Sequence, residues 1–143
     1  MNDLFLDTQF FIAFASRNDM NHRTARAWAD WISRRRPRLH YHDGILLEIG
    51  DGFSSHGHAA TGRGLVEDLL ADPLAVRHPL SPEVINRAFA FQKSHGDKEW
   101  GLTDCVSFVV MREHNIPAAL TTDRHFQQAG YRALLFEAPP DER

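Results

Sequence analysis

The segment Leu4-Phe5-Leu6-Asp7 sets the fold at the start of this chain. A short apolar run that is cut off by polar residues is typical of a strand buried on both faces of a sheet. Here the run ends at an acidic residue, and the strongly apolar residues 10–14 that follow predict a short helix. The segment therefore predicts a buried strand with an acid at its carboxyl end and a helix directly after it.

The same alternation of short apolar runs and helical patterns continues along the chain. The expected strands are residues 4–6, 39–42, 74–76, 118–121 and 131–136. The expected helices are residues 10–14, 22–36, 43–53, 64–71, 82–93, 104–114 and 123–130, with a flexible connector at 57–64. Strands that alternate with helices form a parallel sheet covered on both faces. The sequence thus predicts an α/β domain.

Four polar residues stand where these helices are expected to begin. Asp43, Ser81, Thr103 and Asp123 each precede a helical pattern, and their side-chain oxygens suit the N-cap position. Pro82 strengthens the second of these predictions, because proline is favoured at the first helical position.

Length and composition indicate a single globular domain. The 143 residues favour one domain, which we place at residues 1–136, followed by a loose tail at 137–143. A content of 43% hydrophobic and 24% charged residues excludes a disordered chain. The net charge of −3 weighs against a protein that binds nucleic acid through bulk positive charge. It does not exclude an enzyme that acts on nucleic acid at one local site.

The single cysteine and the length of the apolar segments bear on the cellular compartment in which the protein is expected. Cys105 has no partner for an intrachain disulfide and lies in an apolar run, so we expect a small core residue in a reducing environment. No stretch approaches the roughly 18 apolar residues of a membrane span. The first residues lack the pattern of a signal peptide. We therefore expect a cytoplasmic protein that does not contact a membrane.

Four acids occupy comparable places in the alternation of elements. Asp7 and Asp123 follow expected strands, Asp104 opens an expected helix, and Glu48 lies beside the apolar stripe of another. Each alone could be a helix cap, a first-turn acid or an exposed helix residue. Ligands of open parallel sheets bind beyond the carboxyl ends of the strands, so these acids could meet at one edge.

Carboxylates gathered at one edge would repel one another unless cations or shifted pKa values compensate. Clustered oxygen ligands are what Mg²⁺ or Mn²⁺ prefers. Such ions activate water and stabilise charge in phosphoryl displacement, so the acids predict hydrolysis of a phosphodiester.

Four segments, taken in order, resemble the PIN-domain ribonucleases and are most similar to the VapC-type toxins of bacterial toxin–antitoxin pairs. The segments are residues 5–8, 46–48, 100–105 and 120–130. The resemblance runs from about residue 4 to residue 135. It implies a three-layer α/β/α sandwich with a central parallel sheet.

The resemblance also implies roles for particular residues. Asp7 and Asp104 would be the principal metal ligands, Glu48 and Asp123 would complete the cluster, and Thr121 would support the site from a strand end. The implied activity is that of a Mg²⁺- or Mn²⁺-dependent endoribonuclease, with a cognate antitoxin and a homodimeric assembly. A stand-alone PIN nuclease in RNA processing and a catalytically silent PIN-like binding module remain as alternatives.

Other polar residues have weaker claims to function. Lys98 and Arg124 lie close in sequence to proposed site acids and could contact a substrate phosphate, and His125 and Trp100 lie near the same edge. His40 and His42 could share one face of a strand and chelate zinc, as could His56 with His58, but surface or loop histidines are the favoured interpretation. The basic residues 34–38 form either a solvated helix end or a phosphate-tracking patch.

The aromatic residues near the N-terminus supply more apolar surface than one short helix usually buries. We assign most of them to the core, and some to a dimer or antitoxin groove that the resemblance suggests. These residues are Phe10, Phe11, Phe14, Trp28 and Trp31.

Overall fold

The structure, a computed structural model, describes residues 1–55 and 57–140 of the chain. At its centre is a five-stranded sheet with strand order β3-β2-β1-β4-β5, in which every neighbouring pair is parallel. The strands are β1 (Asp3–Leu6), β2 (Arg38–His42), β3 (Ala75–His78), β4 (Ala118–Leu120) and β5 (Arg132–Ala133). The predicted parallel sheet is confirmed.

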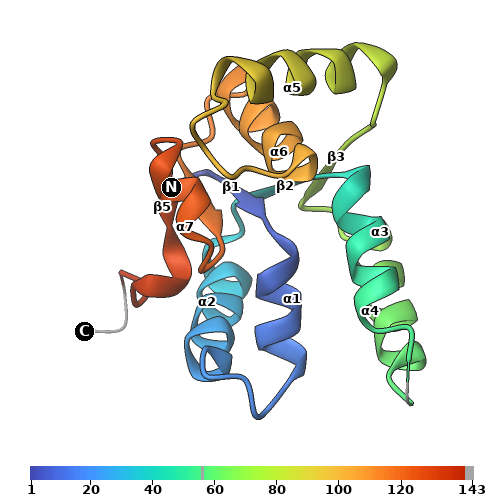
Figure 1. The fold of residues 1–143 in the computed structure, drawn as a ribbon. Coiled ribbons are helices and arrows are strands. Elements are labelled where there is room, and N and C mark those ends of the chain that lie inside the picture. The colour runs from blue at the N-terminus through green and yellow to red at the C-terminus, as the bar shows by residue number, and fades with distance from the viewer. Residues whose placement is uncertain (56, 141–143) are drawn as a thin grey trace.

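Helices cover both faces of this sheet, as Figure 1 shows. On one face α5 (Pro82–Ser94) packs on α6 (Leu102–Glu113), which contacts β2. The other face carries α1 (Thr8–Ala15), α2 (His22–Arg35), α3 (Asp43–Gly52) and α4 (Ala59–Ala71). The short α7 (Arg124–Gln128) lies between β4 and β5 in the chain, and a 3₁₀ helix (Leu134–Phe136) follows β5. The expected three-layer α/β/α sandwich is confirmed.

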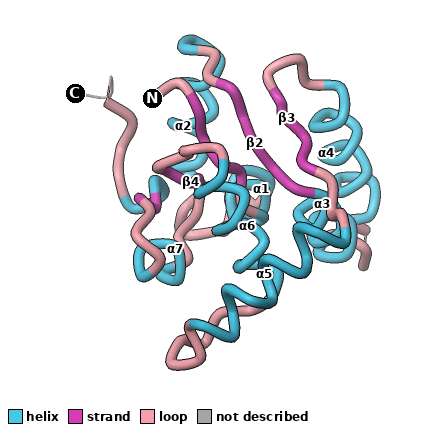
Figure 2. The backbone as a smooth tube through the Cα atoms, turned by 90° about the horizontal axis from the view of Figure 1, so that it is seen from above, coloured by secondary structure: helices cyan, strands magenta, loops and turns pink. Residues whose placement is uncertain are grey.

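The core forms where the sheet meets α6 and α2. The apolar residues of β1 are buried, because helices cover the strand on both sides, and residues 105–111 of α6 are buried without interruption. Cys105 is among them, so the prediction of a core cysteine is confirmed. β2 lies between β1 and β3, and Figure 2 shows β2 and β3 running side by side.

The C-terminal segment is attached to α2 through one buried indole. Trp28 Nε1 donates to the carbonyl oxygens of Leu134 (3.0 Å) and Glu137 (2.9 Å). The second contact is made by the first residue of the expected tail, and residues 141–143 of that tail lie outside the described part of the chain.

Two of the four predicted N-caps are wrong. The N-cap of α3 is His42, whose Nδ1 accepts from Gly44 N at 3.0 Å, and Asp43 is already helical. Gly44 permits this contact, since a Cβ there would lie 2.7 Å from His42 Cε1. The N-cap of α6 is Gly101 rather than Thr103, because Cys105 N bonds Gly101 O and starts the helix earlier. The caps at Ser81 and Asp123 are confirmed.

Two other boundaries also differ from expectation. The connector is shorter than predicted because α4 already begins at Ala59, and Gly62 within it lets this helix approach Phe53 closely. The last strand stops at Ala133, where the backbone turns into the 3₁₀ helix and Leu135 N bonds Thr121 O. Within residues 1–55 and 57–140, the helices are too short or too polar to cross a bilayer.

Candidate active site

Asp7 and Thr121 meet at the carboxyl ends of two neighbouring strands. Asp7 directly follows β1 and Thr121 directly follows β4, and the parallel register pairs Leu6 with Leu120. Thr121 Oγ1 donates to Asp7 Oδ2 at 2.7 Å. Asp7 occupies the N-cap position of α1, yet its side chain makes no cap hydrogen bond. The carboxyl group of Asp7 is therefore joined to the end of the neighbouring strand through Thr121.

The same hydroxyl group reaches a second acid. Thr121 Oγ1 accepts from Asp123 N at 2.9 Å, and Asp123 Oδ1 accepts from His125 N at 2.9 Å as the cap of α7. Because Thr121 is fully buried, its hydroxyl holds the backbone of Asp123 and the carboxyl of Asp7 in one fixed arrangement.

Asp104 approaches from the first turn of α6. Its Oδ2 lies 3.2 Å from His125 Nδ1, which is also 3.4 Å from Asp123 Oδ1. Asp104, Asp123 and His125 each offer one ligand atom, and these atoms lie within 4.8 Å of one another. Sequence reasoning placed His125 near this edge and gave it no role. The available signal was its position two residues after Asp123, in the first turn of a helix.

Glu48 comes from α3, which packs against α1. Its Oε1 accepts from Thr8 Oγ1 at 2.7 Å, which joins α3 to the first residue of α1. The helix continues past Glu48 through Gly50 to Gly52, so the glycines do not interrupt it. We refer to Asp7, Glu48, Asp104 and Asp123 as the acid edge.

The ionised forms of the buried carboxyl groups in the acid edge are unfavourable. Burial raises the pKa of Asp7 to about 7, and the Asp104 and Glu48 carboxylates add to this shift, while the Thr121 hydrogen bond opposes it. The pKa of Asp104 is also raised, by burial and by the Asp123 carboxylate, against the hydrogen bond from His125. These repulsive interactions connect all four acids, so a positive charge placed among them would stabilise their ionised forms.

A divalent metal ion fits this donor set. Carboxylates that raise one another's pKa gain stability when a cation lies among them, and oxygen ligands of this kind suit Mg²⁺ or Mn²⁺. The acids that resist ionisation most, Asp7 and Asp104, are those that burial removes from water. A metal ion bound by the acid edge would replace the lost hydration.

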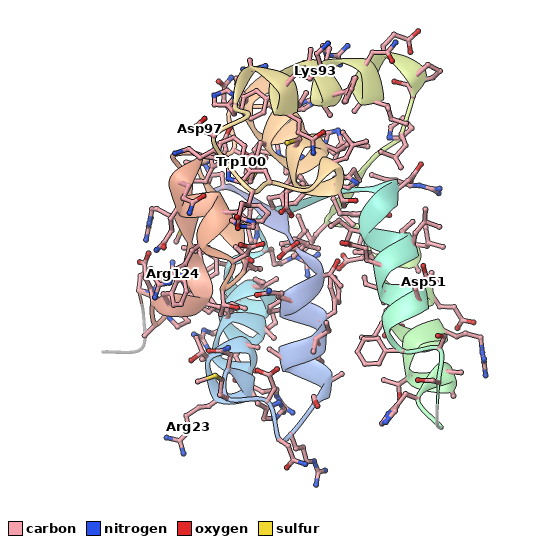
Figure 3. The ribbon with its side chains drawn as sticks, in the orientation of Figure 1. Arg23, Asp51, Lys93, Asp97, Trp100 and Arg124 are labelled. Atoms are coloured by element: carbon pink, nitrogen blue, oxygen red, sulfur yellow. The ribbon has the colours of Figure 1, made fainter. Side chains whose placement is uncertain are left out.

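The predicted phosphate-contacting residues lie on two separate segments. Lys98 is exposed in the loop before α6 and pairs with Asp97 at 3.4 Å. Arg124 is exposed on α7, and its guanidinium lies 4.8 Å from the centre of the Phe136 ring (Figure 3). Trp100 is buried and donates to Gln128 Oε1 at 3.0 Å, so it packs in the structure and does not present a free face to a base.

The strand histidines are buried, so the expectation of surface or loop residues is wrong for them. His40 lies between Asp3 (2.8 Å) and His78 (3.0 Å). The ring of His42 contacts Gly44 N and, at 2.9 Å, Ser107 Oγ. We call His40, His42 and His78 the histidine layer. His58 is exposed, and residue 56 lies outside the described part of the chain.

The basic residues 34–38 lie at the opposite edge of the sheet from the acids. Arg34 and Arg35 are in the last turn of α2, where the helix dipole favours cations. Arg38 begins β2 and pairs with Asp3 at 2.9 Å. Because the strands are parallel, the start of β2 is remote from the end of β1, where Asp7 lies.

An α/β/α sandwich with acids at the carboxyl ends of its parallel strands defines a class of metal-dependent hydrolytic sites. The family model described as "PIN domain" matches residues 4–130, and the chain belongs to this family. The resemblance noted from the sequence is thereby confirmed.

Particular relatives match over nearly the whole chain. A Mycobacterium tuberculosis protein named 23S rRNA-specific endonuclease VapC20 is 28% identical over 131 residues, covering 90% of this chain and 95% of the relative. The crystal structure of M. tuberculosis VapC20, described as a sarcin–ricin loop cleaving toxin, superposes with a TM-score of 0.78 at 22% identity and the same coverage. FitAcB from Neisseria gonorrhoeae matches with a TM-score of 0.61 at 21% identity, covering 91% of this chain and 95% of that one.

Proposed function

We propose that this protein is a Mg²⁺- or Mn²⁺-dependent endoribonuclease that acts as the toxin of a toxin–antitoxin pair. The observation that carries this proposal is the buried Asp7 carboxyl, whose pKa rises to about 7 among Asp104 and Glu48 at the strand ends. The similarity to VapC20 over 90% of the chain supports RNA as the substrate.

In this proposal the acid edge binds the metal. Asp7 and Asp104 are the principal ligands, and Glu48 and Asp123 complete the set directly or through water. A bound ion supplies an activated water and stabilises the charge that develops on the phosphate during in-line hydrolysis. Thr121 fixes the orientation of Asp7 through the hydrogen bond at 2.7 Å and so holds the ligand in place.

Lys98 and Arg124 contact substrate phosphates in the same proposal. Both are exposed, on either side of the segment that carries Asp104. With two such cations and a net charge of −3, we expect RNA binding to be weak without metal and only moderately sensitive to salt.

A cognate antitoxin would bind the apolar groove between α1, α2 and α4. The groove has a volume of about 210 Å³ and is lined by Phe10, Phe11, Phe14, Ile32 and Leu69, with Asp68 and Asp72 among its polar residues. These residues suit an apolar segment with basic flanks. The protein is further proposed to be cytoplasmic and homodimeric, as the family resemblance implies.

The decisive experiment measures cleavage of RNA by the purified protein with Mg²⁺, with Mn²⁺ and with a chelator. Asp7→Asn should reduce the metal-dependent rate at least about 100-fold, since it removes a charged ligand without changing shape. Asp51→Asn is the matched control, because Asp51 is an exposed acid of α3 outside the acid edge (Figure 3). Cleavage that persists in chelator, or no cleavage with either ion, would overturn the proposal.

A second arm distinguishes a toxin from a stand-alone nuclease. Expression of the chain in bacteria should arrest growth, and co-expression of a small protein encoded beside it should restore growth. The Asp7→Asn variant should be harmless in the same cells. Growth unaffected by the active nuclease would favour the alternative role in RNA processing.

A further inference from the structure

We infer that His125 is itself a metal ligand, so that the site holds one nitrogen donor beside its carboxylates and favours Mn²⁺ over Mg²⁺. The inference rests on the metal-dependent function proposed above. It extends the ligand set beyond the four acids and makes the choice of metal ion a property of one side chain.

The position of the imidazole carries the argument. His125 Nδ1 lies 3.2 Å from Asp104 Oδ2 and 3.4 Å from Asp123 Oδ1, and these acids come from different helices. Among the described residues, these three side chains form the group whose ligand atoms converge within 4.8 Å. Adjacent ligands of an octahedral ion with bonds of about 2.1 Å are about 3 Å apart. The two distances from His125 Nδ1 are therefore close to those between adjacent ligands of one ion.

The two contacts of His125 Nδ1 are long for charge-assisted hydrogen bonds, which fall at about 2.7–2.9 Å. One proton on Nδ1 can reach both carboxylates only as a shared, weaker hydrogen bond. A divalent ion placed among the three groups would interact with both acids at once. The arrangement is better matched to a metal ion than to a proton.

The folding of α7 does not depend on this ring. The side chain of His125 is 32% exposed, and its cap contact with Asp123 uses the backbone N–H. The buried anchor of α7 is the next residue, Phe126, which packs among Phe5 and Phe108. A substitution at His125 can therefore remove the nitrogen donor and leave the helix in place.

Ligand chemistry gives the direction of the metal preference. Mg²⁺ strongly prefers oxygen donors and holds its waters, whereas imidazole suits transition metals. Asp104 belongs to both parts of the site, since its charge raises the pKa of Asp7 while its Oδ2 contacts His125. An ion in contact with His125 consequently shares Asp104 with the rest of the acid edge.

The test uses the purified full chain with Mn²⁺ as the probe. Pulsed electron paramagnetic resonance of bound Mn²⁺ should show nitrogen-14 modulation from a coordinated imidazole, and His125→Gln should abolish it. His58→Gln is the matched control, because His58 is exposed at the N-cap of α4, a helix that lies on the opposite side of the molecule from α7 in Figure 1. That variant should retain the signal.

Calorimetry supplies an independent readout. The ratio of the Mn²⁺ and Mg²⁺ affinities should fall about tenfold in His125→Gln, with a far-ultraviolet spectrum like that of the wild type. A nitrogen signal that is absent from the wild type, or that persists in His125→Gln, would overturn the inference. A nitrogen signal in a protein that cleaves no RNA would support the ligand assignment and overturn the nuclease proposal, so the two can fail separately.

Discussion

Helix α6 borders two groups of ionisable side chains that are built in opposite ways. Its first turn carries Asp104 of the acid edge, and one turn later Ser107 contacts His42 of the histidine layer. Both groups remove titratable side chains from water. In the acid edge, the neighbours of each carboxylate include further carboxylates, and the pKa of Asp7 and of Asp104 rises.

The histidine layer satisfies its own polar groups. Both ring nitrogens of His42 have partners, and His40 lies in a chain from Asp3 to His78. Burial lowers the pKa of His42 and of His78 to about 4, so both rings stay neutral near pH 7. The difference teaches that clustering alone does not indicate function. A cluster whose buried polar atoms have hydrogen-bond partners in the protein stabilises the fold, and a cluster of like charges requires a cation from outside.

The largest expected effect is a gain of stability when a carboxylate of the acid edge is removed. In chelator at pH 8, Asp7→Asn should raise the free energy of unfolding by on the order of 2–4 kcal/mol, because the buried charge is lost. The raised pKa means that the folded wild type binds a proton below about pH 7, so the gain should shrink to about 1.5 kcal/mol at pH 5 and vanish only below about pH 4, where the unfolded chain is protonated as well. Urea denaturation measures both values, with Asp51→Asn as the control. A loss of stability at pH 8 would contradict the comparison.

The histidine layer should respond to pH in the opposite direction. The pKa of His42 is lowered to about 4 in the folded protein. Between about pH 4 and pH 6.5, the imidazole therefore binds a proton in the unfolded chain and not in the folded protein. Stability should therefore be complete above pH 6.5 and fall by about 2 kcal/mol at pH 5. His42→Asn, which can still cap α3, should weaken this dependence. Denaturation curves are best compared in the Asp7→Asn background, and an unchanged slope would refute the assignment.

Thr121 tests whether the acid edge depends on its one buried hydroxyl. Thr121→Val keeps the shape and removes the hydrogen bonds to Asp7 and to Asp123 N. We expect a fall of about 10–100-fold in RNA cleavage and a loss of about 1–3 kcal/mol in stability. Thr121→Ser should restore most of both. Equal cleavage by the valine and serine variants would show that the hydroxyl does not position the site.

The smallest effect is expected at the outer end of the histidine layer. Asp3→Asn removes an ion pair with the largely exposed Arg38, while the amide oxygen can still accept from His40. The loss of stability should be below about 1 kcal/mol, and the cleavage rate should not change. A loss well above this value would contradict the assignment of Asp3 to a weak, solvent-screened ion pair.

Local patterns predicted the elements better than their ends. The run Leu4–Leu6 was sufficient to predict β1, and the pair Ser81-Pro82 was sufficient to predict the start of α5. Both signals act within a few residues of the chain. The start of α3 was misplaced because a histidine, an uncommon cap, accepts the hydrogen bond and Gly44 makes room for it. After the end of β5, the chain is held by Thr121 and by Trp28, which is more than 100 residues away, and no local pattern encodes these contacts.

The sequence by itself determined the parallel α/β order and the candidate acids at strand ends and helix starts, because periodicity and position along an element are local properties. Only the tertiary structure decided which polar groups meet. It joined Asp7 to Thr121, brought His125 between two acids and buried His40 beside Asp3. These outcomes depend on strand register and helix packing, which join residues up to 114 positions apart in the chain.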